Sequence, residues 1–260
     1  MRRVVFNQKG GVGKSSIATN LAAISAWEGY KTLLIDLDVQ GNSSSYLGIN
    51  THDEDECPQN NIADFFRRSS GGILTVKRSP DYFVHDTDIE NLYLIPSSPE
   101  LESLEMELER RHKIYKLKEA LVELGEDYDR IYIDTPPNFN FYSKSALIAA
   151  DTALIPFNCD SFSRQALYNL MANLEELGED HNPDLVIEGV IVNQFLSQAK
   201  LPGELIAELK DEGLPVLNSY LSSSIKMKES QCAQSPMIVF AGSHKLTRQL
   251  VDLYNEIEGE

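Results

Sequence analysis

Residues 9 to 16 read KGGVGKSS, a glycine-rich loop of the type that closes around phosphate groups. An apolar run of strand length, RVVF at 3 to 6, precedes the loop, and a helix-like stretch follows it. A simple glycine-rich turn would not need this order of strand, loop and helix, whereas a nucleoside triphosphate site does. The loop therefore predicts an α/β fold that binds a nucleoside triphosphate.

The residues of this loop have separate expected roles. Backbone N–H groups of Gly10, Gly11 and Gly13 surround phosphate oxygens. Lys14 brings a positive charge to the β- and γ-phosphates, and the Ser15 hydroxyl is a ligand for Mg2+.

A second lysine, Lys9, stands at the mouth of the loop. The ordinary motif has glycine five positions before Gly13, and this chain has Gln8 there. The loop is thus a deviant form in which lysine is the first characteristic residue.

Length and composition favour one domain. A chain of 260 residues with 42% hydrophobic content can bury one sizeable core, so we expect a single domain over residues 1–260. No apolar run approaches the ~20 residues of a membrane span, and the loop begins too early for a signal peptide, which predicts a cytoplasmic protein. Cys57, Cys159 and Cys232 lie far apart without CxxC spacing, and we expect them to be ordinary reduced residues.

Charge is distributed unevenly along the chain. The net charge of -17 argues against general nucleic-acid binding, because an acidic surface repels a polyanion. Residues 213–250, however, carry a net +3, with Glu229 as the one acid. The four cations of this segment are Lys226, Lys228, Lys245 and Arg248. A local basic patch and a merely solvated helix end both remain open.

Apolar runs of strand length alternate with longer helix-like stretches. The runs lie at residues 3–6, 32–36, 92–95, 130–134, 152–157, 186–193 and 214–220. Such strands predict a mostly parallel twisted sheet with helices on both faces, and ligands bind beyond the carboxyl ends of its strands. Between them, residues 99–124 favour a charged helix with Leu101, Leu104 and Leu108 on one stripe, and SSGG at 69–72 predicts a turn or loop.

Two carboxylates follow the second strand, in the segment DLDVQGN at 36–42. Asp36 and Asp38 lie where the triphosphate is expected, so one can hold a Mg2+-bound water while the other orients the attacking water. Asp38 is the better candidate for the attacking water. The alternative is that both carboxylates cap the following turn.

A third carboxylate ends the strand IYID in IYIDTPP at 131–137, which has the form of a Walker B strand. Asp134 would approach the metal through water, while Thr135 and the two prolines form a constrained turn that could sense the γ-phosphate. The alternative is a plain strand followed by a proline turn.

KGGVGKSS, DLDVQGN and DTPP, in this order, resemble the ParA/MinD family of deviant Walker A ATPases, and the similarity extends over essentially the whole chain. NLAAISAWEGYKTLLIDLD at 20–38, IPSSPEL at 95–101, IPFNCDSFSRQAL at 155–167 and VNQF at 192–195 add to it. Together these segments point to the Soj-like ParA branch, which positions DNA or large protein cargo.

The resemblance implies a role for each matching residue. Lys9 reaches across an ATP-sandwiched homodimer to the partner's phosphates, and Gly10 lies at that interface. Asp38 supports hydrolysis, and Asp134 binds the metal through water. The implied nucleotide-binding residues are Gly10, Gly11, Val12, Gly13, Lys14, Ser15, Ser16 and Asn193, with Asn193 near the adenine. The expected catalytic set is Lys9, Lys14 and Asp38, and the expected metal set is Ser15, Asp36 and Asp134.

The chain departs from the family pattern at two places. The first switch usually reads DxDPQGN, and Val39 here replaces the proline, which removes a φ constraint. Relatives often display arginines for nonspecific DNA binding where this chain has SSSIKMKES at 222–230, so Lys226 and Lys228 are the nearest equivalents.

The leading interpretation is a cytoplasmic, Mg2+-dependent ATPase that dimerises on ATP and then binds duplex DNA nonspecifically on the nucleoid. A ParB-like or cargo-adaptor protein would stimulate its hydrolysis. A MinD-like membrane ATPase is disfavoured, because residues 251–260 end in four acids without lysine or arginine. A biosynthetic enzyme on the same loop, such as a cobyrinate amidase or a dethiobiotin synthase, is the third interpretation, and an iron–sulfur scaffold is disfavoured by the missing cysteine pairs.

Overall fold

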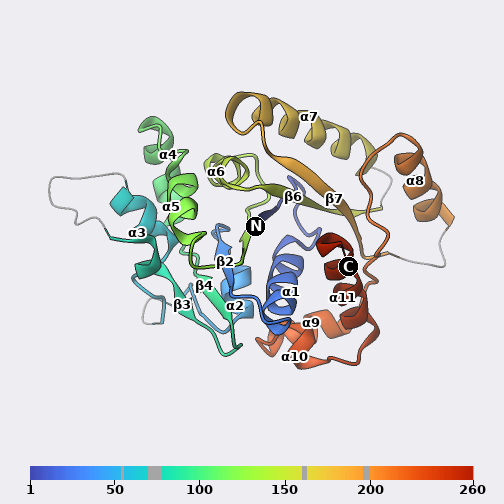
Figure 1. Cartoon of the computed structure of the whole chain (residues 1–260), viewed down its shortest axis with the longest axis horizontal. Coiled ribbons are helices and arrows are strands. Elements are labelled where there is room, and N and C mark those ends of the chain that lie inside the picture. Colours follow the sequence, from blue (N-terminus) through green and yellow to red (C-terminus); the bar gives the residue numbers. More distant parts are fainter. Residues whose placement is uncertain (54–55, 70–77, 160–162, 196–199, 260) are drawn as a thin grey trace.

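A computed structural model describes residues 1–53, 56–69, 78–159, 163–195 and 200–259 (Figure 1). Strands in these residues form one seven-stranded sheet in the order β3-β4-β2-β5-β1-β6-β7. The strands are β1 (Arg2–Val5), β2 (Thr32–Asp36), β3 (His85–Asp86), β4 (Leu92–Ile95), β5 (Arg130–Asp134), β6 (Thr152–Asn158) and β7 (Val186–Asn193).

Neighbouring strands run parallel except β3, which pairs antiparallel with β4. In this register Asp134, the last residue of β5, lies opposite Val5 of β1 on one side and Asp36 of β2 on the other. The carboxyl ends of three central strands therefore meet at one edge of the sheet, which is where the sequence places its phosphate loop and carboxylates.

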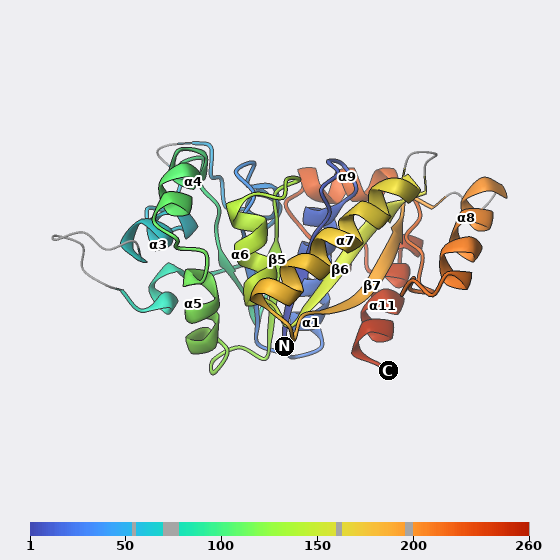
Figure 2. The same cartoon turned by 90° about the horizontal axis from the view of Figure 1, so that it is seen from above.

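Helices cover both faces of the sheet (Figures 1 and 2). One face packs against α3 (Ile62–Ser69), α4 (Leu101–Arg110), α5 (Lys116–Leu124), α6 (Phe141–Ala149) and α7 (Ser163–His181). The other packs against α1 (Lys14–Trp27), α10 (Met237–Phe240) and α11 (Lys245–Glu258). The remaining helices are α2 (Asn42–Tyr46), α8 (Lys200–Asp211), α9 (Ile225–Cys232) and a 3-10 turn at Pro80–Phe83.

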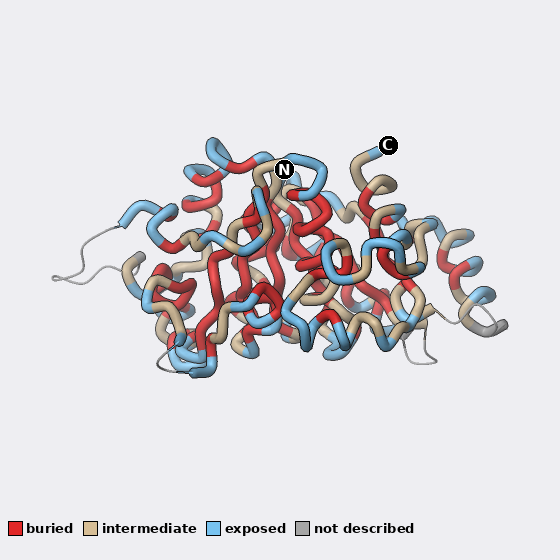
Figure 3. The backbone as a smooth tube through the Cα atoms, turned by 90° about the horizontal axis from the view of Figure 1, so that it is seen from below, coloured by how far each residue is buried: buried red, intermediate tan, exposed pale blue. Residues whose placement is uncertain are grey.

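The strand sequences explain this layering. All five residues of β2 are buried; Leu33 and Ile35 join the core beneath α3–α7, while Leu34 joins the core beneath α1 and α11. A strand covered on both faces needs apolar residues at successive positions, and for this reason these strands read as continuous apolar runs. Buried backbone runs through the middle of the molecule, with exposed segments outside (Figure 3).

Most predicted strands are confirmed. The runs at 32–36, 92–95, 130–134 and 186–193 match their strands, while β1 begins and ends one residue earlier than predicted and β6 extends to Asn158. The prediction of a strand at 214–220 is wrong, because Val216 forms only an isolated bridge with Val190. Pro215 accepts a hydrogen bond from Val190 but has no N–H to donate, so the ladder does not extend.

The predicted helix over 99–124 is two helices. Leu101, Leu104 and Leu108 are buried as expected, but α4 ends at Arg110 and α5 begins at Lys116. His112 takes a left-handed φ of 53°, its N–H donates to Glu109, and the next N–H donates to Leu108. This is the Schellman ending of a helix, which reverses the chain locally.

Two smaller predictions have different outcomes. None of the three cysteines forms a disulfide, as expected. The predicted turn at 69–72 falls mainly on residues 70–72, which lie outside the described residues, and Ser69 is the last residue of α3.

Candidate active site

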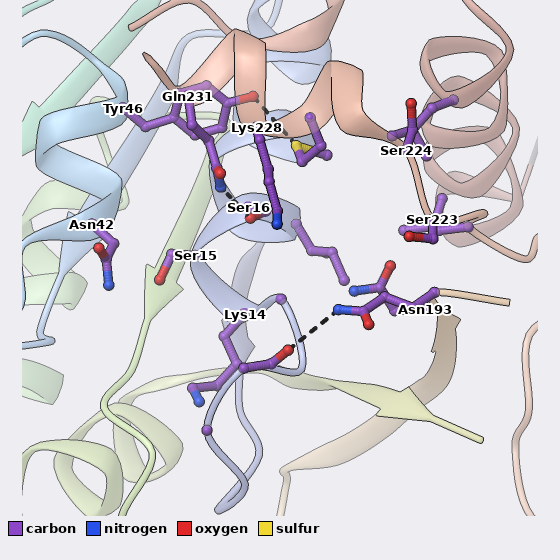
Figure 4. A pocket seen from close by; sticks show the side chains of 18 of the residues that line it. Lys14, Ser15, Ser16, Asn42, Tyr46, Asn193, Ser223, Ser224, Lys228 and Gln231 are labelled. Carbon is purple, nitrogen blue, oxygen red and sulfur yellow. Dashed lines mark hydrogen bonds between the residues drawn. The ribbon is translucent and has the colours of Figure 1, made fainter. Parts of the chain in front are cut away.

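The carboxyl ends of β1 and β2 open into a cavity of about 680 Å³. The phosphate loop and the start of α1 form one wall, the segment after β2 forms another, and α9 with the chain before it forms a third (Figure 4). Such a volume is in the range of small-molecule sites, so segments far apart in sequence enclose one binding space.

The phosphate loop is held in a conformation that depends on glycine. Gly11 and Gly13 have φ values of 73° and 93°. A Cβ on Gly13 would lie 2.4 Å from Nδ2 of Asn193, whose amide donates to the Val12 carbonyl at 2.8 Å. Asn193, at the end of β7, thus fixes the loop from the far side, and Gly13 leaves space for it.

The two lysines of the loop differ in exposure. Lys14 is buried, and its Nζ lies 3.2 Å from the carbonyl oxygen of Lys9, to which it donates. Burial lowers the pKa of Lys14, and the charges of Asp134 and Asp38 oppose this shift. Lys9 is exposed, and its backbone N–H donates to the Asn7 side chain at 2.9 Å. One lysine therefore lies inside the cavity wall, and the other faces outward.

Asp36 and Asp38 have different roles in the structure. Asp36 is fully buried; its Oδ2 accepts from the N–H and hydroxyl of Ser44, each at 2.8 Å, and its Oδ1 accepts from the Asp38 N–H. Burial, with the nearby Asp134 charge, raises the pKa of Asp36 well above its usual range. Asp36 therefore holds the segment after β2 in place, while Asp38 lines the cavity.

The turn around Asp38 is ordered without the family's proline. Its Oδ1 accepts from the Gln40 N–H at 3.1 Å, and its carbonyl accepts from the Gly41 N–H at 2.9 Å. Val39 packs partly buried against the core. Burial raises the pKa of Asp38, opposed by the Gln40 hydrogen bond and the Lys14 charge.

Asp134, the last residue of β5, is fully buried. The hydroxyl of Ser43 donates to its carboxylate at 2.7 Å, and the N–H of Thr135 donates to it at 3.0 Å. Burial raises the pKa of Asp134 to about 6, and the hydroxyls of Ser15 and Ser43 oppose this shift. Ser15 and Asp134, two of the three predicted metal residues, therefore lie close enough for one to affect the pKa of the other.

Helix α9 covers the cavity, which the sequence reasoning did not anticipate. Gln231 donates from Nε2 to the Ser16 hydroxyl at 2.7 Å (Figure 4). Tyr46 forms a hydroxyl hydrogen bond with Ser230. Lys228 also lines the cavity. The motif marks Ser16, but nothing in the spacing of residues 42–46 and 225–232 indicates that they meet, since that depends on how α9 docks.

The four predicted DNA-contacting cations do not form one uniform patch. Lys226 forms an ion pair with Glu229 at 2.6 Å, and Lys228 faces the cavity. Lys245 is exposed at the start of α11, and Arg248 donates to the Ser243 carbonyl at 2.8 Å. Their role in DNA binding stays a prediction.

Within the described residues, no cluster of three or more His, Cys, Asp or Glu side chains could hold a metal ion. A Mg2+ ion bound together with phosphates needs only one or two carboxylates, so this finding is compatible with the predicted site. In the same part of the chain, no helix is both long enough and apolar enough to cross a membrane.

Comparison with known proteins gives consistent results. The family described as AAA domain (AAA_31) matches residues 3–187. The chromosome partitioning protein ParA of Myxococcus xanthus is 32% identical over 238 residues, 91% of this chain and 80% of that protein. The sporulation initiation inhibitor protein Soj of Bacillus subtilis is 29% identical over 97% of this chain and 96% of its own length.

Solved structures share the fold. Apo McdA from Cyanothece superposes with a TM-score of 0.84 at 23% identity, covering 99% of each chain. A plasmid partition protein of Borrelia burgdorferi bound to AMPPNP has a TM-score of 0.75 at 26% identity, over 99% of this chain and 96% of that one. Cobyrinic acid a,c-diamide synthase from Mycobacterium smegmatis, bound to ADP and magnesium, has a TM-score of 0.76 at 26% identity, over 94% and 97%.

Proposed function

Because the chain belongs to the ParA/MinD family of P-loop ATPases, on its ParA/Soj branch, we propose that it positions or segregates cargo by cycles of ATP-dependent dimerisation. The chain is an ATPase that uses ATP and Mg2+. We treat residues 1–260 as a single ATPase domain, which the single sheet supports. The observation that carries the proposal is the cavity at the carboxyl edge, where Lys14, Asp38 and Ser15 line one space.

The residues fit the cofactors. The left-handed Gly11 and Gly13 are compatible with backbone N–H groups directed at phosphate oxygens, and Lys14 adds a cation. Ser15 and Asp134 supply the hard oxygen atoms that Mg2+ prefers. Bound Mg2+ neutralises charge that develops on the transferring phosphoryl group.

Within this site we assign separate roles to the three carboxylates. Asp38 orients the attacking water, because it lines the cavity and accepts only one hydrogen bond on its carboxylate among those that the structure gives. Asp134, together with Ser15, would hold the metal. Asp36 accepts hydrogen bonds from the N–H groups of Asp38 and Ser44. We therefore assign to Asp36 the role of positioning the segment after β2, and not that of a direct metal ligand.

The dimer step rests on Lys9. Two triphosphates that face each other across an interface repel strongly unless cations lie between them. Lys9 is an exposed cation at the mouth of the loop, where it can reach a second subunit, and Gly10 beside it is also exposed. We propose that the protein is cytoplasmic and that the resulting homodimer binds the duplex DNA of the nucleoid nonspecifically. A ParB-like or cargo-adaptor protein would stimulate its hydrolysis of ATP.

Duplex DNA is a better candidate than a membrane for what the ATP-bound dimer binds. The end of α11 is docked on the body of the protein, since Glu256 accepts from Asn218 and Ser219 and Glu258 pairs with Arg130. A membrane-anchoring helix needs an unpartnered cationic amphipathic face instead.

The test combines mass and DNA binding. Light scattering with ATP and Mg2+ should give a dimer for the wild type and a monomer for Lys9→Ala, while Lys118→Ala on α5 serves as a matched lysine control. In a mobility-shift titration at low salt, only the dimer-forming proteins should bind duplex DNA, and binding should weaken steeply with salt. An unchanged dimer in Lys9→Ala would remove the cross-subunit role, and no DNA binding by wild type would favour a biosynthetic enzyme.

A further inference from the structure

The last two turns of α7 are unusually acidic. Glu175, Glu176, Glu179 and Asp180 fall within the final seven residues of this helix. Carboxylates at a helix C-terminus interact unfavourably with the helix dipole. Among the described residues, the ion pairs of α7 involve only Arg164, at the other end of the helix. No ion pair of the described residues therefore compensates the acidic end of α7.

Gly178 lies among these acids, inside the helix. A Cβ at this position would meet nothing within 4 Å, and the backbone has no positive φ that would favour glycine. Neither close packing nor backbone geometry therefore explains why glycine occupies this position. Alanine would stabilise the helix more than glycine does. Residues that lower the stability of their own helix or strand are concentrated at functional sites.

A groove of about 460 Å³ lies along this part of α7. One face of the helix lines it, with residues spaced by three and four positions: Met171, Leu174, Glu175, Gly178, Glu179 and Asn182. Leu185 and Ile187, at the beginning of the edge strand β7, line the other side. We call this the α7–β7 groove.

The α7–β7 groove lies away from the nucleotide cavity. The groove adjoins the start of β7. Val186 there pairs with Thr152 at the start of β6, so this end of β7 lies at the amino edge of the sheet (Figure 2). The nucleotide cavity is at the carboxyl edge. Val186 beside the groove is 58% exposed, which extends the apolar surface along the sheet edge.

We propose that the α7–β7 groove docks a positively charged, amphipathic segment of a partner protein. Its apolar side chains would cover Met171, Leu185 and Ile187, and its cations would meet Glu175 and Glu179. The bare backbone at Gly178 lets that segment approach the helix closely. The acidic rim favours this occupant over duplex DNA, because the rim repels a polyanion.

The probe is a fluorescein-labelled 18-residue helical peptide of leucine and lysine, with leucines on one face. A peptide of the same composition in scrambled order keeps the charge but loses the amphipathic face. Fluorescence anisotropy with the full chain, without nucleotide, should show at least tenfold tighter binding of the amphipathic peptide. Hydrogen exchange should show its protection concentrated at residues 171–187.

Matched variants separate the groove from general charge. Gly178→Trp should fill the groove with an indole ring, and its Cβ has room because no atom lies within 4 Å of that position. Gly178→Ala leaves most of the groove open and should raise Tm. Glu175→Lys with Glu179→Lys reverses the rim, and Glu102→Lys with Glu109→Lys on α4 makes the same charge change elsewhere. Gly178→Trp and the rim variant should each weaken peptide binding at least tenfold, and both controls should bind within twofold of wild type.

Three results would overturn the proposal. The first is a folded Gly178→Trp variant that binds the peptide as tightly as wild type does. The second is an α4 control that loses as much affinity as the rim variant, which would reduce the effect to net charge. Protection of residues 171–187 by duplex DNA, or by self-association at high protein concentration, would assign the groove to a different occupant. A thermal melt of each variant establishes that it is folded before binding is compared.

Discussion

At the scale of single residues, the site contrasts carboxylates that hold the protein together with one that faces the substrate space. Asp36 and Asp134 are fully buried, and chain N–H and hydroxyl groups donate to both. Asp38 is 7% exposed and borders the cavity. Residue type alone does not separate these roles, but the hydrogen bonds do.

This division predicts the kinetics of two variants. Asp38→Ala should bind ATP and dimerise, but lose about 100-fold or more in kcat, because a positioned carboxylate contributes in this range. Lys14→Gln should weaken nucleotide binding itself, since a buried cation leaves the phosphate site. Equilibrium binding of a fluorescent ATP analogue and single-turnover hydrolysis measure the two effects. Equal affinity and equal residual turnover in both variants would contradict the division.

The raised pKa of Asp134 predicts a pH-dependent stability. The folded-state pKa of about 6 exceeds the ordinary value of 3.8, so the folded chain binds more protons between these values and loses stability as pH rises through them. Asp134→Asn, which stays neutral, should be more stable than wild type at pH 7.5 by ~1–3 kcal/mol.

Urea unfolding of both proteins without nucleotide or Mg2+ tests this linkage. The stability difference should shrink as the pH falls from 7.5 to 4.5. Ser103→Ala, an exposed serine on α4, is the control for an unrelated polar substitution and should show no such pH dependence. A difference that is constant across this range would contradict a raised pKa at Asp134.

At the scale of elements, the sequence predicted what depends on local pattern. β2, β4 and β5 were recognisable because strands buried on both faces are almost continuously apolar, and β7 because most of its residues are apolar. The break between α4 and α5 and the missing strand at 214–220 depend on hydrogen bonds around His112 and Pro215, which no hydrophobic period records. The loop residues of the site were recognisable from their motifs for the same local reason.

The docking of α9 was not predictable from the sequence, because it joins residues that are 184 and 215 positions apart. Gln231 reaches Ser16, and Ser230 reaches Tyr46, only after the sheet and α1 are assembled. The short α9 carries both Lys226 and Lys228, which the sequence grouped together as DNA contacts. In the structure one lysine pairs with a glutamate on the same helix, and the other lines the nucleotide cavity.

The two lysines should therefore respond differently to charge reversal. Lys228→Glu should weaken ATP binding by about tenfold, because a carboxylate then faces the triphosphate, and tenfold corresponds to ~1.4 kcal/mol. Lys226→Glu should leave ATP affinity unchanged and weaken only DNA binding by the dimer. Isothermal titration with a nonhydrolysable ATP analogue, followed by DNA mobility shift, separates the two. Equal ATP affinities of the two variants would contradict a role of Lys228 at the nucleotide site and leave it a candidate DNA contact.

At the scale of the whole molecule, one buried ionic network joins the start of the chain to its end. Arg3 of β1 is 2% exposed and pairs with Glu188 of β7 at 2.9 Å and Glu258 of α11 at 2.6 Å. Arg130 of β5 also pairs with Glu258, at 2.8 Å. The network therefore links three strands of the sheet to the last helix, at the amino edge.

Removing one partner of this network should cost more than removing the pair. Glu188→Leu leaves the buried Arg3 with less compensation and should lower the free energy of unfolding by ~3–5 kcal/mol, whereas Arg3→Met with Glu188→Leu should recover a large part of that loss. Glu208→Ala, which breaks an exposed pair with Arg164, should cost less than ~1 kcal/mol. Urea unfolding without nucleotide measures wild type, Arg3→Met and these three variants under the same conditions. If the double variant were less stable than Glu188→Leu by the full cost of Arg3→Met alone, the two residues would act independently, and the network would not be the link between the termini.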